Sequence, residues 1–180
     1  IGHYSLAQFD ELYDKTIVIN GFSKAYSMTG WRIGYAAGPS SVIKEMKKIQ
    51  GHQTSNVNSI TQKAGVVGLN EVKDEITEMR EEFQKRRDLI FELFSGIKGI
   101  KTLKPQGAFY IFPDFSEIIK KVDGVENDFQ LVEYFIEKAG IVAIPGSMFG
   151  APGYIRFSYA TSMDDIKKGI GKIVDLLNQL

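Results

Sequence analysis

The sequence of 180 residues contains no cysteine, and its 22 lysines and arginines are balanced by 22 aspartates and glutamates. Without cysteine the chain can form neither a disulfide framework nor a thiolate metal site, a composition compatible with a reducing compartment. Without an excess of basic residues it lacks the electrostatic surface on which non-specific nucleic-acid binding depends. We therefore expect a cytoplasmic protein with no nucleic-acid partner.

Long apolar runs and internal repeats are also absent. No stretch approaches the roughly 18 apolar residues that a membrane-spanning helix needs, so we expect no membrane partner. The two histidines, His3 and His52, are isolated, and no His, Asp and Glu cluster has the spacing of metal ligands. We therefore predict no metal site.

The first part of the chain contains short strand and helix patterns. The β-branched run at 16–19 ends at Asn20-Gly21 and predicts a buried strand, and a second apolar stretch covers 31–37. Ser40 or Ser41 is then expected to cap a short helix. The apolar residues expected on one side of that helix are Val42, Ile43, Met46 and Ile49.

From about Ser59 to Phe94 the apolar residues recur at spacings of three, four or seven, which predicts helix. A helix of that length is expected to bend or break, near Gly68 to Asn70. The remaining patterns predict three strands, at 108–112, 141–144 and 154–159, and two helices, at 129–139 and 162–177. In the last helix, Ser162 and Asp165 resemble a capping box.

This order of elements predicts the end of an α/β layer followed by a smaller α+β unit. Because the join lies within the long helical stretch, we predict two domains, residues 1–70 and residues 71–180.

The segment from Gly21 to Gly34 contains the candidate catalytic and binding residues. It follows a predicted strand, and the loops that follow strands of an α/β sheet are common ligand sites. Lys24, once desolvated there, would carry a free amine that can form a Schiff base with a carbonyl. Ser23 and Arg32 could hold a phosphate. A solvated surface loop is the alternative interpretation, and these residues alone leave both open.

Arg156 is the second candidate. In the predicted strand at 154–159 side chains alternate, so Tyr154, Arg156 and Ser158 share one face. An arginine in so apolar a strand needs an anionic partner, because burying it unpaired is costly. That partner is either a ligand carboxylate or a structural Asp or Glu.

The segment Gly21–Gly34 resembles, position for position, the pyridoxal-phosphate attachment signature of the class I/II aminotransferases, the aspartate aminotransferase-like family of fold type I. Small, apolar and small residues precede Lys24, and a spacer, a glycine, Arg32 and a glycine follow it. The resemblance continues downstream through Gly38-Pro39, Gly107-Ala108-Phe109-Tyr110, 145–150 and 153–160, and so covers essentially the whole chain.

The resemblance implies a PLP-dependent transferase-like α/β fold, with the end of the large-domain sheet followed by a small C-terminal α+β domain. Lys24 would bind pyridoxal 5'-phosphate as a Schiff base and move the substrate's α-proton, and Ser23 and Arg32 would hold the cofactor phosphate. Arg156 would bind the substrate α-carboxylate. The full-length protein would transfer an amino group from an amino acid to a 2-oxo acid, as a homodimer.

The family also needs an Asp, a Tyr, an Asn and a phosphate-binding loop upstream of the lysine, and none of these is found here. Asp10–Tyr13 resembles part of that pattern, but we interpret it as a loop or surface helix. The chain, which starts at Ile1, is therefore expected to be the C-terminal portion of a longer enzyme and inactive alone. A carbon–sulfur lyase of the same fold, or the ligand-sensing aminotransferase-like domain of a transcription regulator, are the alternatives.

Overall fold

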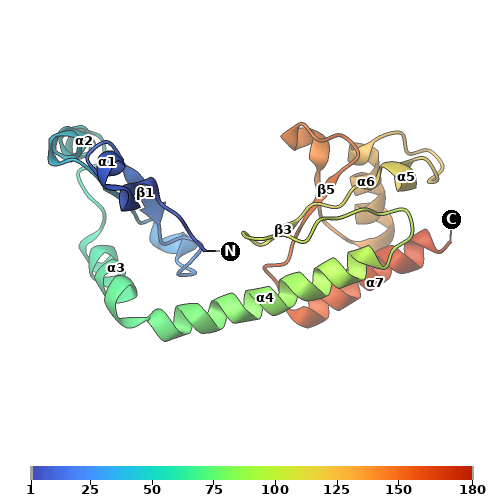
Figure 1. Ribbon diagram of the computed structural model, residues 1–180. Helices are drawn as coiled ribbons and strands as arrows, with labels where there is room; N and C mark the ends of the chain where they lie inside the picture. Colours follow the sequence, from blue (N-terminus) through green and yellow to red (C-terminus); the bar gives the residue numbers. More distant parts are fainter. Residues whose placement is uncertain (1, 180) are drawn as a thin grey trace. The chain divides into compact units, whose positions relative to one another are not determined.

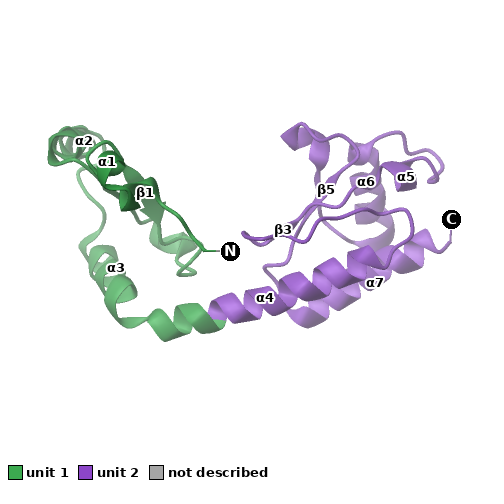
Figure 2. Cartoon of the chain, in the orientation of Figure 1, with its two compact units in different colours: residues 1–78 green, residues 79–180 purple. Residues whose placement is uncertain are grey.

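The structure, a computed structural model, describes residues 2–179 (Figure 1). The chain divides into two compact units, residues 1–78 and residues 79–180 (Figure 2). The division lies inside the long helix α4 (Lys73–Ser95), and each unit is described by itself. Assigning 1–70 to a large domain and 71–180 to a small one stays a prediction. Within residues 2–179, no helix combines the length and the apolarity that crossing a membrane requires.

The first unit contains a two-stranded antiparallel sheet. Strand β1 (Val18–Gly21) pairs with β2 (Gly34–Ala37), with Val18 opposite Ala37 and Gly21 opposite Gly34. The helical elements of this unit are, in chain order, η1 (Leu6–Gln8), α1 (Asp10–Tyr13), η2 (Thr29–Trp31), α2 (Ser40–Gln53) and α3 (Ser59–Glu71). Helix α1 contains no buried residue, so the prediction of a surface element at Asp10–Tyr13 is confirmed.

Strand β1 forms two residues later than predicted, and it is not buried. Ile19, at its centre, is 77% exposed. Phe22 is the only fully buried hydrophobic side chain among the described residues of this unit. The prediction of a buried strand at 16–19 is therefore wrong for this chain, because burial depends on what packs against a strand, which the pattern of one segment does not specify.

Helix α2 also differs from its prediction in burial. It begins at Ser40, as expected, but Pro39 occupies the N-cap position and no side chain caps the helix, so the predicted serine cap is wrong. Its apolar residues are exposed as well: Val42 at 40%, Met46 at 36% and Ile49 at 60%. Three of the four apolar side chains expected on one side of α2 are therefore exposed, like Ile19 of β1.

The predicted break in the long helical stretch is real and lies at Val72. Helix α3 ends at Glu71, and α4 begins at Lys73. Val72 has φ −113° and ψ 36°, outside the helical region. The break is two residues beyond the predicted Gly68–Asn70, and Gly68 lies inside α3.

The second unit is built on a three-stranded antiparallel sheet in the order β3-β5-β4. The strands are β3 (Tyr110–Ile111), β4 (Ile144–Pro145) and β5 (Ile155–Ser158), each shorter than predicted. The helical elements are α4, α5 (Ser116–Ile119), α6 (Asp128–Ala139), η3 (Gly146–Phe149) and α7 (Met163–Leu177).

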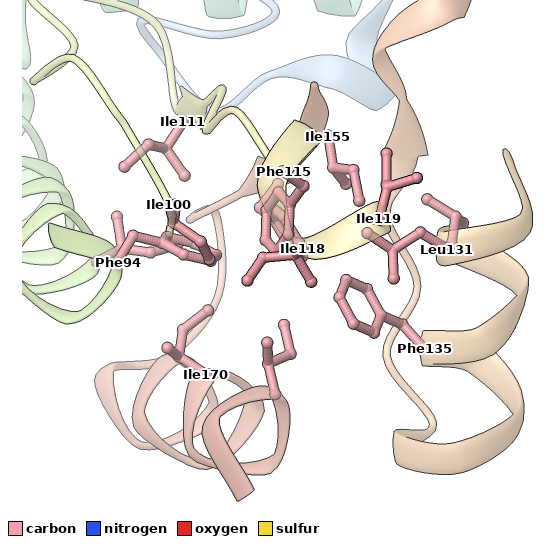
Figure 3. Packing of buried hydrophobic residues seen from close by; sticks show 14 of the residues in the cluster. Phe94, Ile100, Ile111, Phe115, Ile118, Ile119, Leu131, Phe135, Ile155 and Ile170 are labelled. Carbon is pink, nitrogen blue, oxygen red and sulfur yellow. The ribbon is translucent and has the colours of Figure 1, made fainter. Parts of the chain in front are cut away.

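A continuous hydrophobic core holds the second unit together (Figure 3). Phe94 of α4, Phe135 of α6 and Ile173 of α7 have no exposed surface. Phe115 meets Phe135 edge-on, with ring centroids 5.7 Å apart. Side chains from these helices and from β5 bury one another, so the sheet that carries Arg156 rests on a fixed support.

The ends of the last two long helices confirm the sequence predictions. Gly140 ends α6 in the left-handed conformation, at φ 66°, where glycine carries no Cβ penalty. The Ser162 hydroxyl caps α7 by accepting the Asp165 backbone N–H at 3.1 Å, and it donates to the Asp165 carboxylate at 2.7 Å. Ile166, Ile170 and Ile173 form the buried side of α7.

Candidate active site

Three of the predicted site residues lie on one loop. Ser23, Lys24 and Arg32 all belong to the segment 22–33 that connects β1 to β2. Backbone hydrogen bonds close this loop on itself, among them Tyr26 N–H to the Phe22 carbonyl at 3.2 Å and Ser27 N–H to the Lys24 carbonyl at 3.1 Å. The loop therefore has a defined shape, although it contains no strand.

Packing of Phe22 against α3 holds this loop in place. The Phe22 ring contacts the Tyr26 ring at a tilt of 43°, with centroids 4.8 Å apart. A Cβ built on Gly65 or on Gly68 of α3 would lie 3.5 Å from the Phe22 ring, an ordinary van der Waals distance, so the ring packs directly on this face of the helix. This contact fixes the backbone two residues before Lys24.

Arg32 adopts the left-handed conformation, with φ 51° and ψ 52°. This backbone region costs a residue with a side chain about 1 kcal/mol or more, so surrounding contacts must impose it. Its guanidinium donates from Nη1 to the Thr29 carbonyl at 2.8 Å. A guanidinium has five N–H donors, so this bond leaves donors for a second, anionic group.

Lys24 and Arg32 are exposed, and Ser23 is half-buried. The exposure of Lys24 differs from the desolvated position that we expected. The donor set nevertheless fits a phosphorylated aldehyde, because it combines one primary amine, one hydroxyl and one guanidinium on a single loop. Pyridoxal phosphate is such a molecule.

Arg156 lies in the second unit, on the central strand β5. Ile155 and Phe157 on either side of it are buried, at 0% and 5% exposure, and Arg156 itself is half-buried. Its guanidinium carbon lies 4.3 Å from the Tyr110 ring centroid and 4.5 Å from that of Phe149. The predicted alternation along this strand is confirmed.

Within residues 2–179, Arg156 forms no ion pair with an Asp or Glu. Its environment is two aromatic rings, which attract the cation through their faces. Stacked contacts occupy the flat face of a guanidinium and leave its edge, where the N–H donors lie, available to a carboxylate. None of the described Asp or Glu residues supplies the structural salt bridge that we considered, and binding of a ligand carboxylate by Arg156 stays a prediction.

The sequence did not predict a buried carboxylate that is hydrogen-bonded to the turn carrying Phe149, one of the two rings at Arg156. Asp128, at the start of α6, is 1% exposed. It accepts the Ser147 backbone N–H at 2.7 Å and the Ser147 hydroxyl at 2.7 Å. The signal in the sequence was weak, since an acidic residue in the first turn of a helix is ordinary. Its long-range partner, 19 positions on, appears only in the folded chain.

The environment of Asp128 holds the pKa of its carboxyl below the ordinary value. Burial acts in the opposite direction and raises the pKa, but hydrogen bonds from Ser147 and from the Gly153 backbone favour the charged form more strongly. The unfolded chain has no such bonds, so the pKa of its aspartates is about 3.9.

We expect the charged Asp128 to make stability depend on pH. Because the folded pKa lies below the unfolded one, the contribution is complete above about pH 5 and declines as the pH falls through the folded value. Asp128→Asn should cost about 1.5–3 kcal/mol at pH 7 and clearly less at pH 3, measured by urea unfolding of the chain. The exposed Asp123→Asn is the control. An Asp128→Asn cost that is equal at both pH values would contradict the prediction.

Comparison with known proteins identifies relatives over almost the whole chain. The family described as aminotransferase class I and II matches residues 2–173. An aspartate aminotransferase of Bacillus sp. strain YM-2 is 45% identical over 172 residues, and the match covers 95% of this chain and 44% of that protein. A probable aspartate/prephenate aminotransferase of Aquifex aeolicus is 43% identical over 173 residues, covering 95% of this chain and 43% of that protein.

Among solved structures, the aspartate aminotransferase from Rhizobium meliloti matches this chain with a TM-score of 0.88 at 39% identity. That match covers 97% of this chain and 45% of the crystallised one. The chain thus spans less than half the length of the relatives it matches.

Proposed function

Because the chain belongs to the aminotransferase class I and II family, we propose that the complete protein transfers an amino group from an amino acid to a 2-oxo acid with pyridoxal phosphate. The family match over residues 2–173 and the relatives' names support this reaction class. The predicted PLP-dependent transferase-like α/β fold is confirmed by the likeness to aspartate aminotransferase structures. Aspartate is the substrate class that those names suggest.

The observation that carries the proposal is the composition of the 22–33 loop. It holds Lys24 exposed, between the packed ring of Phe22 and the left-handed Arg32. We propose that Lys24 attaches the cofactor, and that Ser23 and Arg32 bind its phosphate through a hydroxyl and a planar guanidinium. When bound, pyridoxal phosphate supplies an electron sink for the pair left behind as the α-proton departs.

Two residues of the chain would then have separate roles in the reaction, Lys24 and Arg156. Lys24 Nζ would accept the substrate's α-proton and deliver it to the cofactor carbon that had carried the aldehyde oxygen. Arg156 holds the α-carboxylate through two parallel N–H donors and thereby orients the bond to hydrogen. Both half-reactions use the same two side chains, since donor and acceptor share the α-carboxylate.

A cytoplasmic homodimer without nucleic-acid partners remains our proposal for the complete protein. The balanced charge of 22 cations and 22 anions supports the absence of a nucleic-acid partner. We further propose that the 180-residue chain alone has little or no activity. The family resemblance assigns none of its residues to the acidic group that would pair with the pyridine nitrogen.

The test is to add pyridoxal phosphate to the complete protein that contains this sequence, reduce with borohydride, and locate the modified residue by mass spectrometry. We expect the label on Lys24 and none on Lys44, an exposed lysine of α2 that serves as the internal control. A label on another residue instead of Lys24 would refute the assignment. A parallel assay with an amino acid, with and without 2-oxoglutarate, separates transfer from lyase chemistry, because only transfer requires the acceptor.

A further inference from the structure

The surroundings of Arg156 point to a residue that acts on the substrate from a distance. Arg156 lies over the rings of Tyr110 and Phe149, at 4.3 and 4.5 Å from the guanidinium carbon to each centroid. Tyr110 is part of strand β3, which pairs directly with β5. Phe149 belongs to no strand. It is the last residue of the short turn η3 (Gly146–Phe149), and its ring packs edge-on against Phe112, with centroids 6.1 Å apart. The position of its backbone depends on how the turn itself is held.

The first support of this turn is close packing at Gly146. Its backbone N–H donates to the Tyr154 carbonyl at 2.7 Å. A Cβ at this position would meet the carbonyl oxygens of Ala151 and Tyr154, the second at 2.6 Å. Only glycine fits so tight an approach, and the turn is thereby held against the chain segment that enters β5.

The second support is the buried carboxylate of Asp128. It accepts both the backbone N–H and the hydroxyl of Ser147, the residue that follows Gly146 and precedes Phe149 by two. Two bonds to one residue fix its orientation as well as its position. Because Asp128 is 1% exposed and begins α6, these bonds tie the turn to a helix that is packed into the core through Leu131 and Phe135.

We propose that Asp128 is a positioning residue for substrate binding: through Ser147 it sets the place of the Phe149 ring, which in turn holds the Arg156 guanidinium edge-on to the substrate carboxylate. This inference rests on the proposed function, because it takes Arg156 as the carboxylate-binding residue. Asp128 itself touches neither the arginine nor the substrate in this mechanism. Its two carboxylate oxygens accept the two donors of Ser147, one each.

The test measures binding of maleate, a dicarboxylate without an amino group, to the cofactor-loaded complete protein by calorimetry. Asp128→Ala is expected to weaken binding on the order of tenfold, since small displacements of a binding group have effects of this size. Asp128→Asn should stay within about threefold, because an amide can still accept from the Ser147 N–H and donate to its hydroxyl. In steady-state assays the same Asp128→Ala change should raise KM for both substrates more than it lowers kcat.

A double-mutant cycle with Phe149→Leu separates positioning from general destabilisation. If Asp128 acts through Phe149, adding Asp128→Ala to Phe149→Leu will weaken maleate binding no further. The matched control is Asp165→Ala, which removes another serine-bonded helix-terminal carboxylate, at 2.7 Å from Ser162, without touching the η3 turn. It should lower stability and leave maleate affinity unchanged.

Two results would overturn the inference: unchanged maleate affinity in Asp128→Ala, or additive effects of Asp128→Ala and Phe149→Leu. Where Asp128→Ala does not fold, Ser147→Ala takes its place, since it removes the side-chain bond and keeps the carboxylate. Arg156→Ala identifies a failure of the proposed function instead. If that change leaves maleate affinity intact, Arg156 is not the carboxylate-binding residue, whatever Asp128 does.

Discussion

Replacing Lys24 by alanine is expected to lower kcat of the complete protein by about 10³-fold or more, while the protein stays folded. A positioned general base contributes about 10²–10⁴-fold to a rate, and here the same amine also attaches the cofactor covalently. Lys24 is exposed and contributes little packing, so its removal should change the unfolding midpoint only slightly. The measurement is steady-state transamination together with thermal unfolding.

Lys44→Ala provides the control for the loss of one exposed lysine from the same unit and should leave kcat within about twofold. A Lys24→Ala protein that retains a tenth of the normal rate would exclude Lys24 as the proton carrier. A loss of activity accompanied by unfolding would instead place its role in stability.

Expressed alone, the 180-residue chain is expected to protect the amides of its two units very differently from hydrogen exchange. Unit 2 has a buried core, with Phe94, Phe135 and Ile173 at 0% exposure, whereas Phe22 is the only fully buried hydrophobic side chain described in unit 1. Opening free energies range from near zero to the global stability of about 5–15 kcal/mol. We expect protection in the unit 2 core to exceed that in unit 1 by on the order of 10³-fold.

Hydrogen exchange monitored by mass spectrometry tests this difference in protection. It compares peptides of β1, α2 and α3 with peptides of α6, β5 and α7. Repeating it on the complete protein is the control, since an added layer over the exposed Ile19 and Ile49 side chains should raise protection in unit 1 alone. Equal protection of both units in the isolated chain would show that unit 1 is stable without further covering.

Local patterns predicted local structure well in this protein. The glycine stop after Ala139, the Ser162 cap and the alternation around Arg156 are properties of a few neighbouring residues, and each was confirmed. Predictions that depended on distant partners were less successful. The strand at 16–19 was expected to be buried and is not. One local prediction was also wrong, since Pro39 takes the N-cap position of α2 where a serine was expected.

By itself the sequence determined the fold class, the attachment-like loop with Ser23, Lys24 and Arg32, and the presence of an arginine in an apolar strand. The loop and the arginine are visible as residue types at short spacings, and the fold class follows from the order of the predicted elements and from the resemblance that these motifs carry. Only the tertiary structure decided what surrounds that arginine: two aromatic rings, one of them on the turn whose Ser147 donates two hydrogen bonds to Asp128, 19 positions away. A partner at that separation is chosen by how α6 and the η3 turn pack on a common core, and no local pattern encodes it. The absence of cysteine and of net charge excluded classes of protein; the packing showed which side chains are held in place.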